Sequence, residues 1–114
     1  MPELPDYTLE SFARFFEAIP EDRWMVNGYA DGQGRHDAAG HLGAVPFQHY
    51  SHAPAAKAFN ELLKPIGRHI LDVNDLNRDL SKLGPKHRVM IAIDLARKFY
   101  AENPDAVPRL SRPS

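Results

Sequence analysis

The sequence predicts a mainly α-helical, compact single domain of about four helices, with room for one small two-stranded β element. A chain of 114 residues has an ordinary length for one domain. The composition, 43% hydrophobic and 25% charged, is that of a globular protein. Apolar residues also recur at helical spacing in several segments. We therefore assign residues 1–103 to one globular domain and expect a flexible tail at 104–114, where three prolines and two arginines occur.

The first and last predicted helices have the clearest signals. The first covers residues 8–19, with Thr8 as its N-cap and Pro20 ending it. Its phenylalanines fall on one face, which indicates core packing. The last runs over residues 85–102, because Pro85 suits the first helical position. Its apolar arc is so wide that we expect it at the centre of the core or at an interface between two copies.

Two further helices are expected between them. The small-residue segment 37–45 is predicted as a short helix with Asp37 as its N-cap. Gly40 and Gly43 lower its helix propensity, and their expected use is close approach of another backbone or a ligand. The next covers residues 54–64 and starts at a proline.

The remaining segments are predicted as extended chain and turns. Residues 24–29 have an extended pattern, and the glycines of residues 31–34 are typical of a turn. Residues 70–73 fit either a short strand or a helical turn, and the pattern does not separate the two. Asn74 and Asp75 follow as a turn or helix cap.

Composition excludes several classes of protein. The chain has no cysteine, so disulfides and thiolate metal sites cannot form. No signal segment or membrane-length apolar run is present, so we expect a cytoplasmic protein that does not insert in membranes. Residues 1–31 carry seven acids and two bases, whereas residues 32–114 carry eight acids and twelve bases. This asymmetry is too small for a dedicated nucleic-acid binder.

Histidines concentrate in one part of the sequence and suggest a metal site. Imidazole and carboxylate groups are ligands for first-row metals. The spacing, however, favours separate solvated or hydrogen-bonded histidines over a metal site. The alternative metal set is His36, Asp37, His41, His49 and His52.

A second group of residues suggests a small-ligand pocket. Aromatic and imidazole rings stack on planar ligands, and nearby polar groups orient them. Cations would meet a phosphate. In the opposing interpretation, the tryptophan fills the core and the Asn-Asp pair caps a helix. The ligand-binding candidates are Trp24, Tyr29, Arg35, His41, Asn74, Asp75, Lys86 and Arg88.

The order of these features resembles a small uncharacterised family of bacterial and phage proteins. Its pattern is a Trp, a Cys-Ala-x-Gly-Ala/His-Leu segment, an Asn-Asp dipeptide and a final helix. Here the matching positions are Trp24, residues 38–42, residues 73–75 and the helix after Pro85. The resemblance spans roughly residues 9–100.

The resemblance implies a bacterial or phage origin and a shared centre around Trp24, His41 and Asn74, but no activity. Asp37 stands where that family usually has cysteine, so a thiol-based role cannot operate here. Separately, the pair His36-Asp37 is similar to the core dyad of the helical metal-dependent phosphohydrolases. Those proteins need further histidines and a distal aspartate in a helical order that this chain does not match.

These observations favour a small binding or regulatory protein that is not an enzyme and needs no cofactor. No nucleophile elbow or phosphate-binding loop is present in the sequence. The expected partner is a small anionic or nucleotide-like molecule or another protein, and the apolar last helix allows a homodimer. The alternative is a metal-dependent phosphohydrolase that uses the histidine group. A structural component of a larger assembly is a third hypothesis.

Overall fold

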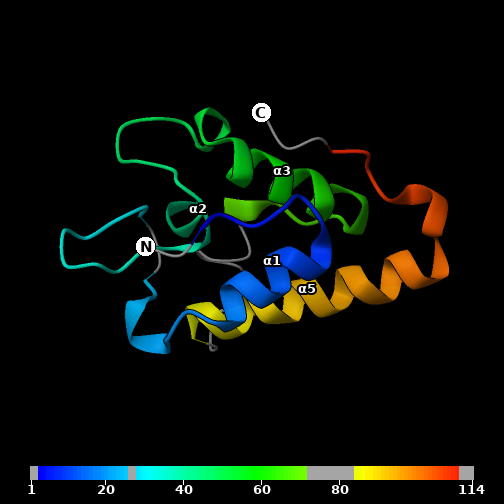
Figure 1. Ribbon diagram of the computed structural model, residues 1–114, viewed down its shortest axis with the longest axis horizontal. Coiled ribbons are helices and arrows are strands. Elements are labelled where there is room, and N and C mark those ends of the chain that lie inside the picture. Colours follow the sequence, from blue (N-terminus) through cyan, green and yellow to red (C-terminus); the bar gives the residue numbers. More distant parts are fainter. Residues whose placement is uncertain (1–2, 26–27, 72–83, 111–114) are drawn as a thin grey trace.

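The computed structural model describes residues 3–25, 28–71 and 84–110 (Figure 1). The described chain is mainly helical, which confirms the predicted fold class. Its α-helices are α1 (Leu9–Glu17), α2 (Ala38–His41), α3 (Pro54–Leu63) and α5 (Pro85–Glu102). Short 3-10 turns lie at Glu21–Arg23, Tyr50–His52, Lys64–Ile66 and Pro104–Ala106.

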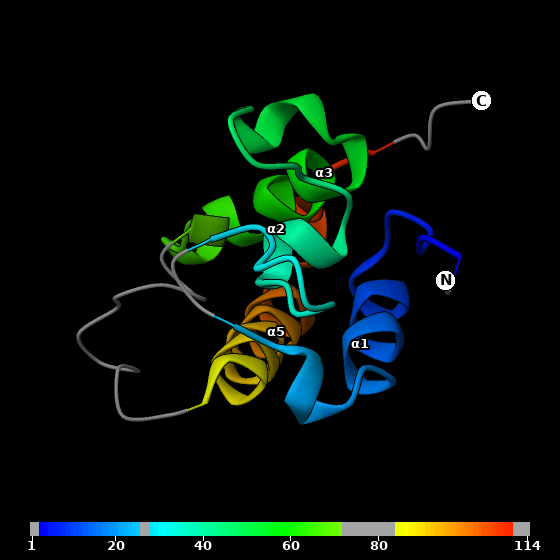
Figure 2. The same cartoon turned by 90° about the vertical axis from the view of Figure 1, so that its left-hand side faces the viewer.

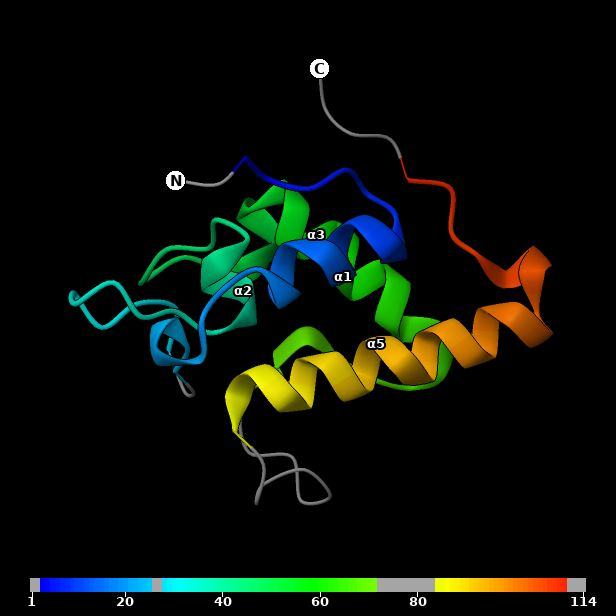
Figure 3. The same ribbon diagram turned by 60° about the horizontal axis from the view of Figure 1, so that its bottom comes forward.

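Helix α1 forms where the sequence predicts it and pairs with α5. The Thr8 side chain accepts a hydrogen bond from the Ser11 amide at 3.2 Å, as an N-cap does. Arg97 of α5 contacts both carboxylate oxygens of Glu10, at 2.7 and 3.0 Å. At the other end, the Lys86 ammonium donates to the Glu17 carbonyl at 2.8 Å. The two helices therefore run antiparallel and side by side (Figures 1 and 3).

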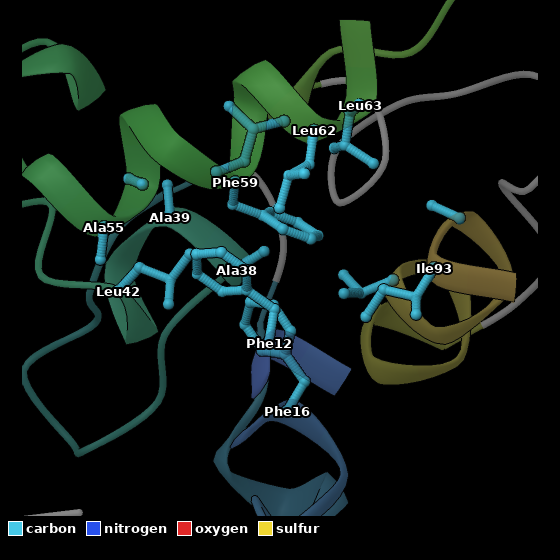
Figure 4. Packing of buried hydrophobic residues seen from close by; sticks show 14 of the residues in the cluster. Phe12, Phe16, Ala38, Ala39, Leu42, Ala55, Phe59, Leu62, Leu63 and Ile93 are labelled. Atoms are coloured by element: carbon cyan, nitrogen blue, oxygen red, sulfur yellow. The ribbon is translucent and has the colours of Figure 1, made fainter. Parts of the chain in front are cut away.

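The core lies where α1, α3 and α5 meet, with α2 closing one side (Figure 4). Phe59 of α3 contacts both Phe12 and Phe16 of α1, with ring centroids 5.1 Å apart in each pair. The Tyr100 hydroxyl donates to the Leu62 carbonyl at 2.6 Å and ties α5 to the end of α3. Buried aromatic rings thus join all three long helices.

Helix α5 contributes one buried face to the core and leaves the other face to solvent, so it is less enclosed than its wide apolar arc predicts. Its buried side chains include Val89, Ala92, Ile93, Ala96 and Tyr100. Leu95 is 42% exposed. No helix in the described part of the chain is long and apolar enough to cross a membrane.

The remaining segments contain little β structure. Within the described residues, the two-stranded element that the sequence allows is reduced to one isolated parallel bridge between Trp24 and His36. Ile70 and Leu71 are helical, and residues 72 and 73 lie outside the described part. In the expected tail, Ala106 and Leu110 are partly buried against the core.

Candidate functional site

The one-turn helix α2 organises the region that the sequence marks as a candidate site. Its N-cap Asp37 is only 2% exposed, and the carboxylate accepts the Gly40 amide at 2.8 Å. Gly40 packs directly on the Tyr29 carbonyl, because a Cβ atom at this position would lie 1.9 Å from that oxygen. The predicted close approach at Gly40 is therefore made by backbone, from the loop that precedes α2.

Trp24 lies inside the core. It is 4% exposed, and its indole nitrogen donates to the Ile19 carbonyl at 3.3 Å. One side of the indole contacts Phe16, and His41 packs against it with ring centroids 4.6 Å apart. This placement matches the interpretation in which the tryptophan fills the core. The ring contributes packing, and too little of it is exposed to stack on a ligand.

His36 and His41 come together beside Trp24. Their ring centroids are 5.1 Å apart in an edge-on arrangement. The backbone bridge fixes His36, because its amide donates to the Arg23 carbonyl and its carbonyl accepts the Met25 amide, both at 3.0 Å. His36 Nδ1 lies 2.8 Å from the Tyr29 carbonyl. Since a carbonyl only accepts, Nδ1 of His36 carries the proton.

His41 is electrostatically unusual. Its Nε2 is buried and has no hydrogen-bond partner within the described residues. Burial, and then the nearby His36, lowers the pKa of His41 from 6.5 to about 4, against a smaller opposing effect of the Arg23 backbone. His41 is therefore neutral near pH 7, and its ring acts as a packing group.

The other predicted metal ligands serve local structure. Asp37 caps α2, and Nδ1 of His49 accepts the Ser51 amide at 3.2 Å. His52 belongs to the same short turn as Ser51. Across the described ranges, no three histidine, aspartate or glutamate side chains gather in a way that could hold a metal ion.

Two of the predicted phosphate-binding cations are bonded within the fold, and the third is buried. Arg35 forms an ion pair with Asp31, whose carboxylate also accepts the Gln33 amide at 2.8 Å. The Gln33 bond and then the Arg35 bond lower the pKa of Asp31 to about 2. Lys86 is bonded to the end of α1, and Arg88 is buried. Of the remaining predicted ligand-binding residues, Tyr29 is partly buried against the core, and Asn74 and Asp75 lie outside the described residues.

An open groove lies on the other side of α1. It has a volume of about 460 Å³ and runs between the N-terminal segment and the helix. Its lining includes Leu4, Pro5, Arg14, Phe15 and Ile19, and none of the predicted ligand-binding residues.

The structure shows a further surface feature, a tight turn at residues 45–48 that we call the Phe47 turn. The Gln48 amide donates to the Val45 carbonyl at 3.3 Å, and Phe47 has a φ of +70°. Pro46 and a positive φ at the next residue define a type II turn, in which glycine normally takes the place of Phe47. The Phe47 side chain is fully exposed, and Val45 is 47% exposed.

Buried residues hold both ends of the Phe47 turn. On one side, Ala44 is buried and its amide donates to the Ala39 carbonyl at 3.0 Å. On the other side, Tyr50 is buried and its ring lies 4.3 Å from that of His49. The segment projects at the same end of the molecule as the loop before α2, at the left of Figure 1 and toward the viewer in Figure 2.

Our sequence analysis did not identify this turn. The available signal is an apolar triplet, residues 45–47, that begins two residues after Gly43, contains a proline and belongs to no helical period. Such a triplet predicts a turn, but exposure of the aromatic ring depends on where the neighbouring elements lie.

Comparisons with protein families, with curated proteins and with solved structures found no match for this chain.

Proposed function

We propose that the protein acts by binding a protein partner through the Phe47 turn and that it is not an enzyme. The observation that carries this proposal is the fully exposed Phe47 side chain, held on a backbone of positive φ. A bulky residue in this conformation costs about 1–2 kcal/mol relative to a helical or extended one. Exposing a phenyl ring to water adds a further cost. Binding to a partner would offset both costs.

The shape of the turn favours a protein partner with an apolar pocket. The turn projects from the molecule (Figure 1), and its three consecutive apolar residues, 45–47, are all exposed. Both of its ends are anchored, so little conformational entropy is lost on binding. Exposed aromatic side chains of this kind are typical energetic centres of protein interfaces.

The surroundings of the turn disfavour a membrane and a small anionic ligand. No lysine or arginine occurs between His36 and Ala56, so the segment that contains the turn supplies no cation of its own to anionic lipid headgroups. Arg35 and Lys86, two of the predicted phosphate ligands, bond to Asp31 and to the Glu17 carbonyl respectively. We accordingly propose a binding or regulatory role in the cytoplasm with a protein as the partner, and not a small anionic or nucleotide-like molecule.

Partner capture with matched variants tests the proposal. The tagged protein, Phe47→Gly and Leu95→Ser would be incubated with an extract of the producing cells, and retained proteins identified by mass spectrometry. We expect at least one protein to be retained by the wild type and by Leu95→Ser and lost by Phe47→Gly. The affinity of the wild type and of Phe47→Gly would then be measured for that purified protein. We expect binding to weaken about 30-fold in Phe47→Gly, because loss of a central interface residue costs about 2 kcal/mol. Equal retention by all three proteins contradicts the proposal, as does retention of none.

The Phe47→Gly variant also separates binding from folding. Glycine is the preferred residue at this turn position, so the change relieves about 1–2 kcal/mol of strain. It also adds freedom to the unfolded chain, which costs about 0.5–1 kcal/mol. The midpoint of urea unfolding should therefore stay the same or rise slightly. A clear fall would indicate that Phe47 stabilises the fold, and the binding result would then have no functional meaning.

A further inference from the structure

A chain of buried polar contacts connects the Phe47 turn to the segment after α3. Tyr50 is the second residue after the turn. Its hydroxyl lies 3.1 Å from Nε2 of His69 and 3.1 Å from the side-chain nitrogen Nδ2 of Asn60. Asn60 is 1% exposed. Its carbonyl oxygen accepts the Ile70 amide at 2.8 Å. One tyrosine hydroxyl thus joins the turn to α3 and to residues 69–71.

The hydrogen bonds define the protonation state of His69. The Leu71 amide donates to Nδ1 of His69 at 3.1 Å, so this nitrogen carries a lone pair. The proton of the neutral ring is then on Nε2, which donates to the Tyr50 oxygen. The amide of Asn60 donates to the same oxygen. His69 can therefore make its hydrogen bonds to Leu71 and Tyr50 at the same time only as a neutral ring with its proton on Nε2.

We propose that His69 is a positioning residue for the Phe47 turn, and that it holds the turn through Tyr50 only while its Nδ1 carries no proton. A proton added to Nδ1 faces the Leu71 N–H, so that two donors meet and the bond is lost. The imidazole is rigid, and turning it away from Leu71 also moves Nε2 away from the Tyr50 oxygen. The C-terminal end of the turn then loses its direct hydrogen bond to His69, and only the indirect connection through Asn60 remains.

Other charged and titratable groups lie close to this connection. His49 packs on the Tyr50 ring, Lys64 interacts electrostatically with Tyr50, and Arg68 precedes His69 in the chain. His49 can also respond to acid by itself, because its Nδ1 accepts the Ser51 amide next to the turn. A test must therefore remove the titration of His49.

The inference gives the proposed binding surface a pH-dependent regulation, and in that sense it rests on the proposed function. Its test needs no partner. In a His49→Asn background, NMR would follow the His69 ring nitrogens, the Leu71 amide, and the backbone order parameters of Phe47 and Gln48. Asparagine keeps the capping acceptor of His49 and does not titrate. The pH would be lowered from about 8 to about 5, the range in which imidazole groups ordinarily gain a proton.

We expect the Leu71 amide and the turn to change at the same midpoint as the His69 ring. The order parameters of the turn should fall from rigid values of about 0.85 to below about 0.6. In Tyr50→Phe, which keeps the ring and removes the hydroxyl, Leu71 should still follow His69 while the turn no longer does. In His69→Asn, which does not titrate, the pH response of the turn should be lost.

Three results would overturn the inference. The first is a turn whose order parameters stay constant while His69 gains its proton. The second is a turn that still responds in Tyr50→Phe or, should that variant not fold, in His69→Asn. The third is a His69 ring that gains no proton over this pH range. Failure of partner capture with a positive result here would reject the proposed function and leave the connection from His69 to the turn intact.

Discussion

Two regions of this protein are stabilised in different ways. Where α1, α3 and α5 meet, side chains at helical spacing fill the interior, and Phe12, Phe16 and Phe59 are fully buried. Around α2, the structure depends on backbone contacts, including the bridge between Trp24 and His36 and the packing of Gly40 on a carbonyl. The first region depends on buried apolar volume, and the second depends on the fit of single atoms.

This difference predicts how each region responds to change. A core of large side chains loses stability with the volume of the cavity that a truncation leaves, because the neighbouring rings relax only partly into the space. A backbone contact cannot relax in this way, so one added atom must displace a whole segment. The α2 region also contains the partly buried imidazole of His41, which makes it sensitive to acid.

The largest expected effect is in the aromatic core. Phe16→Ala removes a ring that contacts Phe59 at 5.1 Å and Trp24 at 5.5 Å. We expect a loss of about 4 kcal/mol in the free energy of unfolding, measured by urea denaturation. The same truncation at the exposed ring, Phe47→Ala, should change this free energy by no more than about 0.5 kcal/mol. An equally small loss for Phe16→Ala would contradict its place in the core, and an equally large loss for Phe47→Ala would contradict its exposure.

Gly40→Ala tests the backbone contact of α2. The added methyl group would meet the Tyr29 carbonyl oxygen at 1.9 Å, which forces the two segments apart. We expect a loss of about 3 kcal/mol in the free energy of unfolding, at the upper end of the usual cost of overpacking. Gly84→Ala is the matched control, because a methyl group there meets no atom within 4 Å. It should cost about 0.5 kcal/mol as an N-cap change, and an equally small loss at Gly40 would contradict the contact.

The smallest expected effect is a loss of folding stability at acidic pH that comes from His41. The pKa of His41 is lowered to about 4 in the folded protein, so folding favours the neutral ring. Its contribution to stability is complete above the unfolded pKa of about 6.5 and is lost as the pH falls from there toward 4. Allowing for partial exposure of the ring, we expect a loss of about 1–2 kcal/mol. Urea denaturation of the wild type and His41→Phe between about pH 7 and pH 4.5 measures it. If both proteins lose stability in parallel, His41 is not the cause.

Local sequence signals predicted the helices well. Thr8, Asp37, Pro54 and Pro85 occupy the predicted start positions of α1, α2, α3 and α5. Capping and proline preferences act within one helical turn, so they can be recognised without knowledge of the rest of the fold. The candidate site was less predictable, because Arg35 and Lys86 each bond to a separate part of the fold and Arg88 is buried.

The sequence by itself determined the helical class, the helix starts and the apolar faces, because these depend on backbone propensity and on residue spacing over a few positions. Only the tertiary structure decided that Trp24 is buried beside His41 and that Phe47 stands in solvent. The same is true of the connection from Tyr50 to Asn60 and His69. Whether an aromatic ring is buried depends on elements that lie far away in the chain, and neither periodicity nor composition contains that information.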